Sequence, residues 1–102
     1  MPAEAPEFID EIAELDPAFG EPFDTVYEEV FSEGALSVKT KLLIMMALDA
    51  GRSQSDGVEI VAQQARDAGA SEEEILETIE VAGLVCGVQG LATGSSALSE
   101  DG

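Results

Sequence analysis

Apolar residues recur with the three-to-four-residue spacing of amphipathic helices along most of the chain. The first predicted helix begins after Pro6 and ends at Asp16-Pro17, because the residue before a proline avoids the helical region. The second is predicted to start at Pro22 and to close at Gly34. No segment shows strand alternation, so the pattern predicts an all-α fold of about five to six helices.

Two further helices are predicted in the middle of the chain. The third begins after Ser37 as its cap and runs to about Ala50. Its centre, residues 42–48, is apolar nearly all round, which predicts burial on most sides. A polar turn over residues 52–57 separates it from a fourth helix that ends at Gly69.

The fifth predicted helix opens with Ser71 and Glu74 spaced as a capping box and continues through Leu91. Residues 1–5 and 95–102 are predicted to fray. At 102 residues the chain is long enough for one modest core, so we expect a single domain over residues 1–102.

Four glycines recur late in the sequence with a spacing that places them on one side of a continuous helix: Gly83, Gly87, Gly90 and Gly94. Glycine lowers helix stability, so such a stripe is typical of close backbone approach to another helix. In a chain this short, we expect that helix to belong to another subunit.

The chain carries 22 acidic and four basic residues, a formal net charge of -18. Nucleic acid and anionic membrane surfaces are not expected as partners, because binding to either needs clustered Lys and Arg. The even spread of the acids favours a protein from a high-salt cytoplasm over an acidic module that docks on a basic partner.

Other features agree with a cytoplasmic location. A lone cysteine, Cys86, cannot form an internal disulfide. The first residues lack the pattern of a signal peptide, and the longest uncharged run, Val81 to Ser99, is too polar to span a bilayer. Because Cys86 lies among the glycines of this uncharged run, it is expected to be a small core residue rather than a nucleophile.

Two segments carry a family resemblance: Leu36 to Leu48, and the junction Ala68-Gly69-Ala70-Ser71-Glu72-Glu73-Glu74-Ile75. With the residues between them and as far as 92, they resemble the carboxymuconolactone decarboxylase and alkylhydroperoxidase-D-like family. The resemblance implies a helical fold that assembles as a homo-oligomer, a trimer or a hexamer.

The redox branch of that family carries a Cys-x-x-Cys-x-x-x-His box and a glutamate on the preceding helix. In this chain the two cysteine positions fall at Gln54 and Gly57, the histidine at Val61 and the glutamate at Leu42. Residues 35–80 contain no Cys and the chain contains no His. Because a thiolate is the required nucleophile, disulfide-based peroxide reduction is not expected.

The lactone decarboxylase branch also lacks the cysteine pair, but the resemblance implies a histidine that this chain does not have. A carboxylate whose pKa is raised by burial could replace it, and Asp56 and Glu59 are the nearest candidates. Arg52 could bind the carboxylate of a small organic acid. The alternative is that all three are solvated surface groups. Neither a cofactor nor a metal site is expected from the sequence.

The leading interpretation is an oligomeric family member with a degenerate, non-redox site. It would be a binding or scaffold protein, or an enzyme of unknown acid–base chemistry. A decarboxylase acting through carboxylates and an acidic interaction module remain alternatives. If the site is degenerate, Leu42 and Val61 should be in apolar contact at the former reactive position. Gln54 should then lie at the rim of that site, with Asp56 and Glu59 turned to solvent.

The net charge predicts that stability rises strongly with salt. Repulsion among the acids acts over a Debye length of about 30 Å at 0.01 M salt and about 3 Å at 1 M. The melting temperature should therefore increase from dilute buffer to molar KCl, as measured by circular dichroism. A melting temperature that does not change across this range would contradict the prediction.

Overall fold

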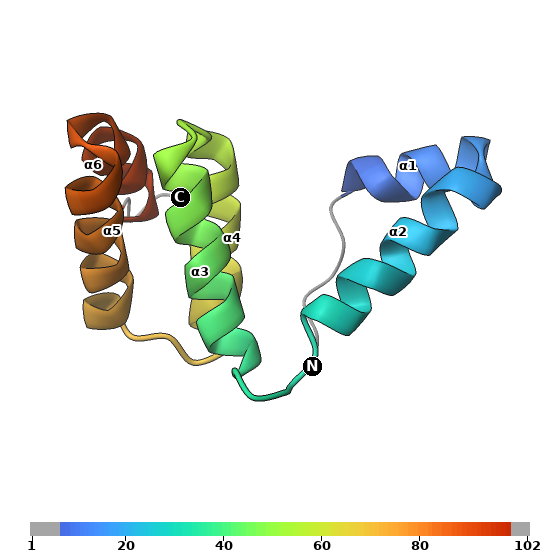
Figure 1. The fold of residues 1–102 in the computed structure, drawn as a ribbon, viewed down its shortest axis with the longest axis horizontal. Coiled ribbons are helices and arrows are strands. Elements are labelled where there is room, and N and C mark those ends of the chain that lie inside the picture. Colours follow the sequence, from blue (N-terminus) through green and yellow to red (C-terminus); the bar gives the residue numbers. More distant parts are fainter. Residues whose placement is uncertain (1–6, 99–102) are drawn as a thin grey trace. The chain divides into compact units, whose positions relative to one another are not determined.

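The computed structural model describes residues 7–98, and every regular element among them is helical. The predicted all-α fold is therefore confirmed (Figure 1). The chain forms two compact units, one up to Val38 and one from Lys39 onwards, and each is described by itself. The single domain over residues 1–102 stays a prediction. Residues 1–5 and 99–102, expected to fray, lie outside the described residues.

The first unit contains a helical hairpin of α1 (Glu7–Leu15) and α2 (Pro17–Val30). The start of the second helix at Pro22 was wrong, because Pro17 takes the first helical position, where its missing N–H costs nothing. The Asp16 carbonyl accepts the amides of Phe19 and Gly20, at 3.1 and 2.9 Å. Gly20 is buried against α1, and a Cβ there would overlap the backbone of Ala13.

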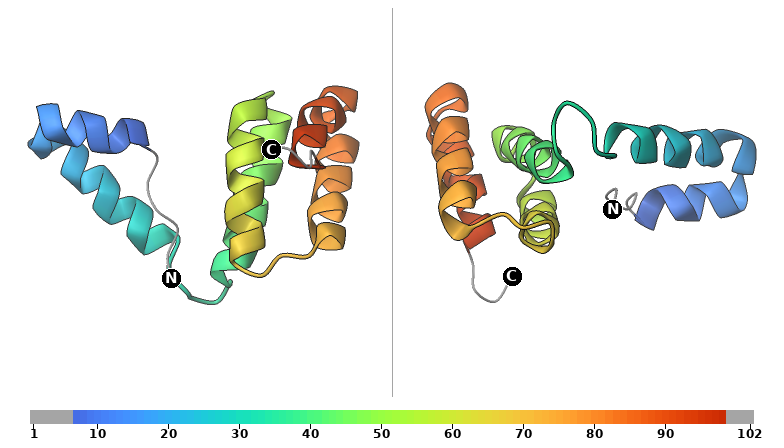
Figure 2. Two further views of the ribbon diagram at one scale, coloured as in Figure 1. Left: turned by 180° about the vertical axis from the view of Figure 1, so that it is seen from behind. Right: turned by 90° about the horizontal axis from the view of Figure 1, so that it is seen from below.

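The second unit holds five helices, which Figure 2 shows from two further sides. They are α3 (Val38–Gly51), α4 (Ser55–Asp67), α5 (Glu72–Cys86), α6 (Val88–Gly94) and the 3₁₀ helix η1 (Ser95–Leu98). The core comes from one stripe of each long helix: Leu42, Met46 and Ala50 of α3; Val58, Ala62 and Ala65 of α4; Ile75, Ile79 and Ala82 of α5.

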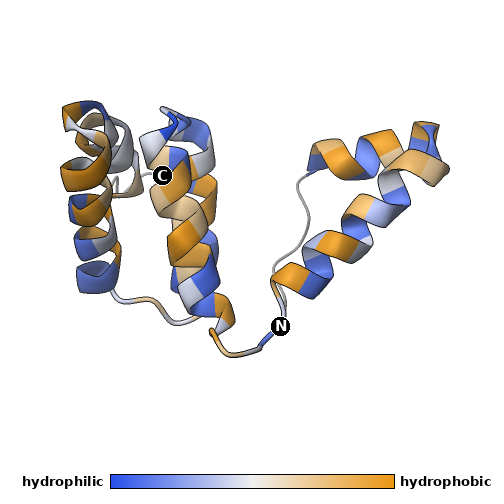
Figure 3. Cartoon of the chain, in the orientation of Figure 1, coloured by the Kyte–Doolittle hydropathy of each residue, from blue (hydrophilic) through white to orange (hydrophobic). Residues whose placement is uncertain are grey.

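Helix α3 is less enclosed than its sequence predicted. One stripe is buried, but Ile44 and Leu48 on other sides are 45% and 61% exposed. A helix of this hydrophobicity normally packs on several sides, and the other helices of the second unit cover only part of its surface. In Figure 3, hydrophobic residues recur along the ribbon of α3.

The predicted capping box at the start of α5 is present. The Ser71 hydroxyl accepts the Glu74 amide at 3.0 Å, and the Glu74 carboxylate accepts the Ser71 amide at 2.8 Å. Lys39 of α3 adds an ion pair with Glu74 at 3.0 Å. The Ser71 amide and then Lys39 lower the pKa of Glu74, so these contacts stabilise the fold until acid protonates this carboxylate.

A continuous fifth helix through Leu91 was the wrong prediction, because α5 ends at Cys86 and the chain reverses at Gly87. Gly87 has φ 94° and ψ 178°, a backbone conformation that only glycine adopts readily. Helix α6 then packs back on α5. The other three glycines allow this close contact within the chain. A Cβ on Gly83 would overlap the Leu91 side chain. A Cβ on Gly94 would lie 2.7 Å from Ile79 Cγ2, and a Cβ on Gly90 would lie 3.0 Å from the Ala82 carbonyl oxygen.

The fraying predicted for residues 95–98 was also wrong. These residues form η1, and Ala97 is buried. Arg66 of α4 holds them in place, because its Nη2 donates to the Ala97 carbonyl at 2.6 Å. The same guanidinium binds both carboxylate oxygens of Glu72, at 2.7 and 2.9 Å. Among residues 7–98, no helix is both long and apolar enough to cross a membrane.

We predict that Gly83→Ala destabilises the second unit, although alanine favours helix by about 1 kcal/mol. The added methyl group would overlap Leu91 and push α6 from α5, and overpacking of this kind costs about 1–3 kcal/mol. Urea unfolding in high salt would measure the loss. Glu80→Ala, at an exposed position one turn earlier, is the control. Equal stability of both variants would contradict the proposed contact.

Candidate functional site

The junction of α3 and α4 is where the family resemblance places reactive groups, and its backbone is tightly turned. The Arg52 amide donates to the Leu48 carbonyl at 3.0 Å, and the Gln54 amide donates to the Asp49 carbonyl at 2.9 Å. Ser53 has φ 61°, in the left-handed region. Helix α4 then begins at Ser55 with no side-chain cap from Gln54.

Side chains from the end of α5 and from α6 support this junction. Gln89 Nε2 donates to the Gly51 carbonyl at 2.8 Å, which satisfies a carbonyl that the end of α3 would leave unpaired. A Cβ on Gly51 would lie 2.8 Å from the Cys86 sulfur. Cys86 itself is exposed, so its prediction as a core residue was wrong. It lies at the last position of α5, where the chain leaves the core to reverse at Gly87.

The four positions of the family's redox site are divided between the core and the surface. Leu42 and Val61 are buried, with exposed fractions of 2% and 6%. Gly57 is half-buried and Gln54 is exposed. At the two positions where the resemblance places a glutamate and a histidine, the chain therefore has enclosed hydrocarbon side chains.

The three acid–base candidates from the sequence lie around the same turn. Asp56 and Arg52 are exposed, and Glu59 is half-buried. Neither of the ion pairs described above, Lys39–Glu74 and Arg66–Glu72, includes Arg52. Among the described residues, no group of three or more Cys, Asp or Glu side chains is placed to hold a metal ion.

The acid with the most unusual surroundings at this junction is Asp49, which the sequence reasoning missed. A Cβ on Gly57 would lie 2.9 Å from Asp49 Oδ2, so the missing side chain of Gly57 leaves room for the carboxylate. Partial burial raises the pKa of Asp49, and the charge of Arg52 partly opposes this shift. One sequence signal was available: an acid in the last turn of a helix opposes the helix dipole, which is unfavourable for stability alone.

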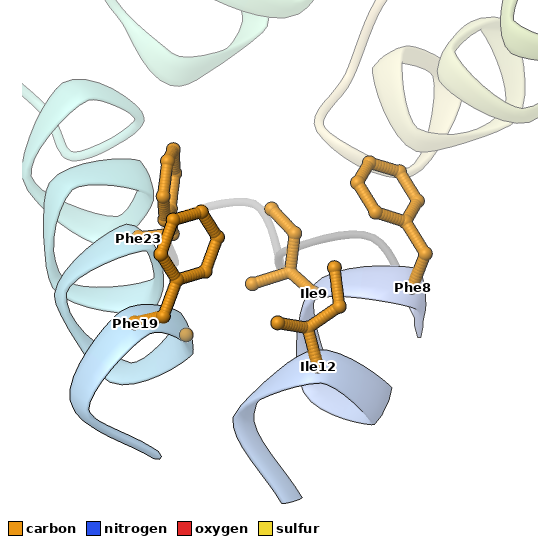
Figure 4. A pocket seen from close by; sticks show the side chains of 6 residues that line it. Phe8, Ile9, Ile12, Phe19 and Phe23 are labelled. Carbon is orange, nitrogen blue, oxygen red and sulfur yellow. The ribbon is translucent and has the colours of Figure 1, made fainter. Parts of the chain in front are cut away.

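A cavity of about 130 Å³ lies elsewhere, within the α1–α2 hairpin (Figure 4). Its lining is hydrocarbon: Phe8, Ile9, Ile12, Phe19, Gly20 and Phe23. Pockets that enclose drug-sized ligands usually measure about 300–1,000 Å³ and contain a few polar groups. The size and lining of this cavity suit apolar side chains better than a metabolite.

The arrangement of helices defines the class of protein. The chain is similar to apo-lpg0406, a carboxymuconolactone decarboxylase family protein from Legionella pneumophila, with a TM-score of 0.82 and 27% sequence identity. The matched region covers 90% of this chain and 82% of the Legionella protein. It is also similar to a putative carboxymuconolactone decarboxylase from Burkholderia xenovorans LB400, with a TM-score of 0.83 and 26% sequence identity. That match covers 92% of this chain and 74% of the Burkholderia protein.

The sequence comparison agrees with the structural one. The profile of the carboxymuconolactone decarboxylase family matches residues 17–100. The chain therefore belongs to the carboxymuconolactone decarboxylase family. No curated protein matches the chain.

We predict that Asp49→Asn raises the melting temperature at neutral pH. Because burial raises the pKa of Asp49, its ionised form destabilises the folded state above the folded pKa. The gain should shrink as the pH falls through the raised folded pKa and disappear well below about pH 3.9, the pKa of an unfolded Asp, where the carboxyl is protonated in both folded and unfolded chains. Asp56→Asn removes the same charge from an exposed position and is the control. A lower melting temperature for Asp49→Asn at neutral pH would contradict this interpretation.

Proposed function

We propose that this protein is a non-redox member of its family that acts as an oligomeric binding or scaffold protein in a high-salt cytoplasm. The burial of Leu42 and Val61 is the observation that carries the proposal. Apolar groups at these positions avoid the desolvation cost of buried charges and favour packing. They can neither transfer a proton nor attack a substrate.

The exposed cysteine does not restore a thiol peroxidase. Such an enzyme needs a thiolate with a lowered pKa and a resolving partner, and this chain has neither a second cysteine nor a histidine.

Homo-oligomerisation is part of the proposal, as a trimer or a hexamer. The glycine stripe no longer supports it, because those glycines serve contacts within the chain. Support now comes from the many large apolar side chains that each unit, taken by itself, leaves exposed, including Leu15 at 88% and Leu84 at 86%. Exposed apolar surface that forms contiguous patches marks interaction sites.

A second candidate function follows from Asp49. Asp49, with Arg52 nearby, could act as a general base on a small organic acid whose carboxylate Arg52 binds. This would be a decarboxylase-type activity, the one for which the similar Burkholderia xenovorans protein is named. Stabilisation of the protein by small lactone carboxylates in a thermal-shift assay, lost in Arg52→Gln, would favour this candidate over a scaffold.

The third alternative, an acidic module for a basic partner, draws its support from the net charge of -18. The acids are divided equally between the two units, eleven in residues 1–38 and eleven in the remainder. Acids that are spread over both units favour solvation in high salt over one docking site.

The leading proposal predicts that the protein has no dithiol-dependent hydroperoxide reductase activity. Val61→Ala should lose about 2 kcal/mol of stability, because two buried carbon groups are removed and a cavity remains. Any other activity of the protein should be unchanged. Ile60→Ala, at the exposed neighbouring position, should change stability little.

A coupled peroxidase assay and urea unfolding test both expectations. Hydroperoxide turnover that Cys86→Ser abolishes would overturn the non-redox proposal. A Val61→Ala variant as stable as Ile60→Ala would remove the argument from packing.

A further inference from the structure

The α1–α2 hairpin presents an apolar surface that its own two helices cannot cover. Phe8, Phe19 and Phe23 are 50–60% exposed and line the cavity between the helices. Figure 4 shows Ile9 and Ile12 of α1 and Phe19 and Phe23 of α2 around it. Gly20 is the only buried residue of the two helices. Helices of 9 and 14 residues are marginal in water unless an apolar face is buried.

A second apolar surface lies where α5 turns into α6. Leu84, Val85 and Val88 are 76–86% exposed on either side of Gly87. We call this surface the α5–α6 end. Hydrophilic residues colour the start of α5 and hydrophobic ones its later turns (Figure 3). This exposure follows from the chain reversal, because the last turn of α5 and the first of α6 leave the core together.

Charge distinguishes among the possible occupants of the hairpin. Residues 1–38 carry eleven acids and no base, so a second hairpin would meet strong like-charge repulsion. Residues 81–99, in contrast, contain no charged side chain. The α5–α6 end contributes no charge of its own, and the acids of the neighbouring α3–α4 junction, Asp49 and Asp56, are accompanied there by Arg52, so it meets less repulsion than a second hairpin would. Its leucine and valine side chains also match the hydrocarbon lining of the cavity.

We propose that the α1–α2 hairpin of one copy receives the α5–α6 end of a second copy, with Leu84, Val85 and Val88 packed against Phe8, Phe19 and Phe23. The two surfaces differ, so the contact is heterologous. Such contacts form a closed ring when the rotation between subunits allows it. This inference rests on the proposed homo-oligomer and specifies which surfaces build it.

The single native cysteine provides a direct test, because Cys86 lies on the α5–α6 end and is exposed. Phe19→Cys places a second thiol in the hairpin. Treatment with a short bis-maleimide in high salt should then give a product of at least twice the subunit mass on a denaturing gel. Mass spectrometry should locate the cross-link between positions 19 and 86. Glu14→Cys is the matched control and should give no such product. Glu14 is exposed like Phe19, but it lies in α1 and does not line the cavity.

Three outcomes would overturn the proposal. A cross-link between positions 19 and 86 that leaves the subunit mass unchanged would mean that the hairpin packs within its own chain. A dimer of Phe19→Cys that persists when Cys86 is replaced by serine would mean that hairpins pair with each other. A Phe19→Cys variant that does not cross-link, although light scattering shows an oligomer, would mean that other surfaces form the interface.

A second variant avoids changing the hairpin. Val85→Glu alters a side chain that is 76% exposed in the single chain, so the helical content should persist. The inserted carboxylate would face the acidic hairpin, and the oligomer mass should fall. An unchanged mass would overturn the proposed contact. A wild-type protein of one subunit mass in molar KCl would instead refute the proposed homo-oligomer itself.

Discussion

The reversal of the chain at Gly87 is the constraint on which the second unit depends. Helix α6 can fold back on α5 only because Gly83 and Gly94 have no side chains where Leu91 and Ile79 lie. This return brings Gln89 to the last carbonyls of α3. It also brings η1 to Arg66, which binds Glu72 at the start of α5. One backbone conformation thus connects the end of the sequence to three earlier helices.

Electrostatics acts on the two units in different ways. All four basic residues lie from Lys39 onwards, and two of them form ion pairs at the start of α5. These pairs are partly exposed, so each contributes modestly to stability but fixes where helices meet. The hairpin has no Lys or Arg, and its acids alternate along the sequence with its aromatic and aliphatic residues. Its structure must therefore rely on apolar contacts and on screening by salt.

Local sequence signals predicted the helices well and their connections less well. The capping box at Ser71 and Glu74 was identified because both partners lie within one turn. The continuous fifth helix was wrong because the glycine spacing suits a straight helix as well as a reversal. Only the positive φ of Gly87 distinguishes the two. Asp49 was missed for a similar reason: its surroundings depend on Gly57 of another helix, which no helical period reveals.

The hairpin also has a consequence for how order is distributed along the chain. With one buried residue in its two helices, it has little internal packing to oppose local opening. Its backbone amides should exchange with solvent deuterium by an opening that leaves the second unit folded. The degree to which these amides are protected from exchange then reports on what covers the hairpin. Dilution or desalting could expose this segment to proteases before the rest of the protein unfolds.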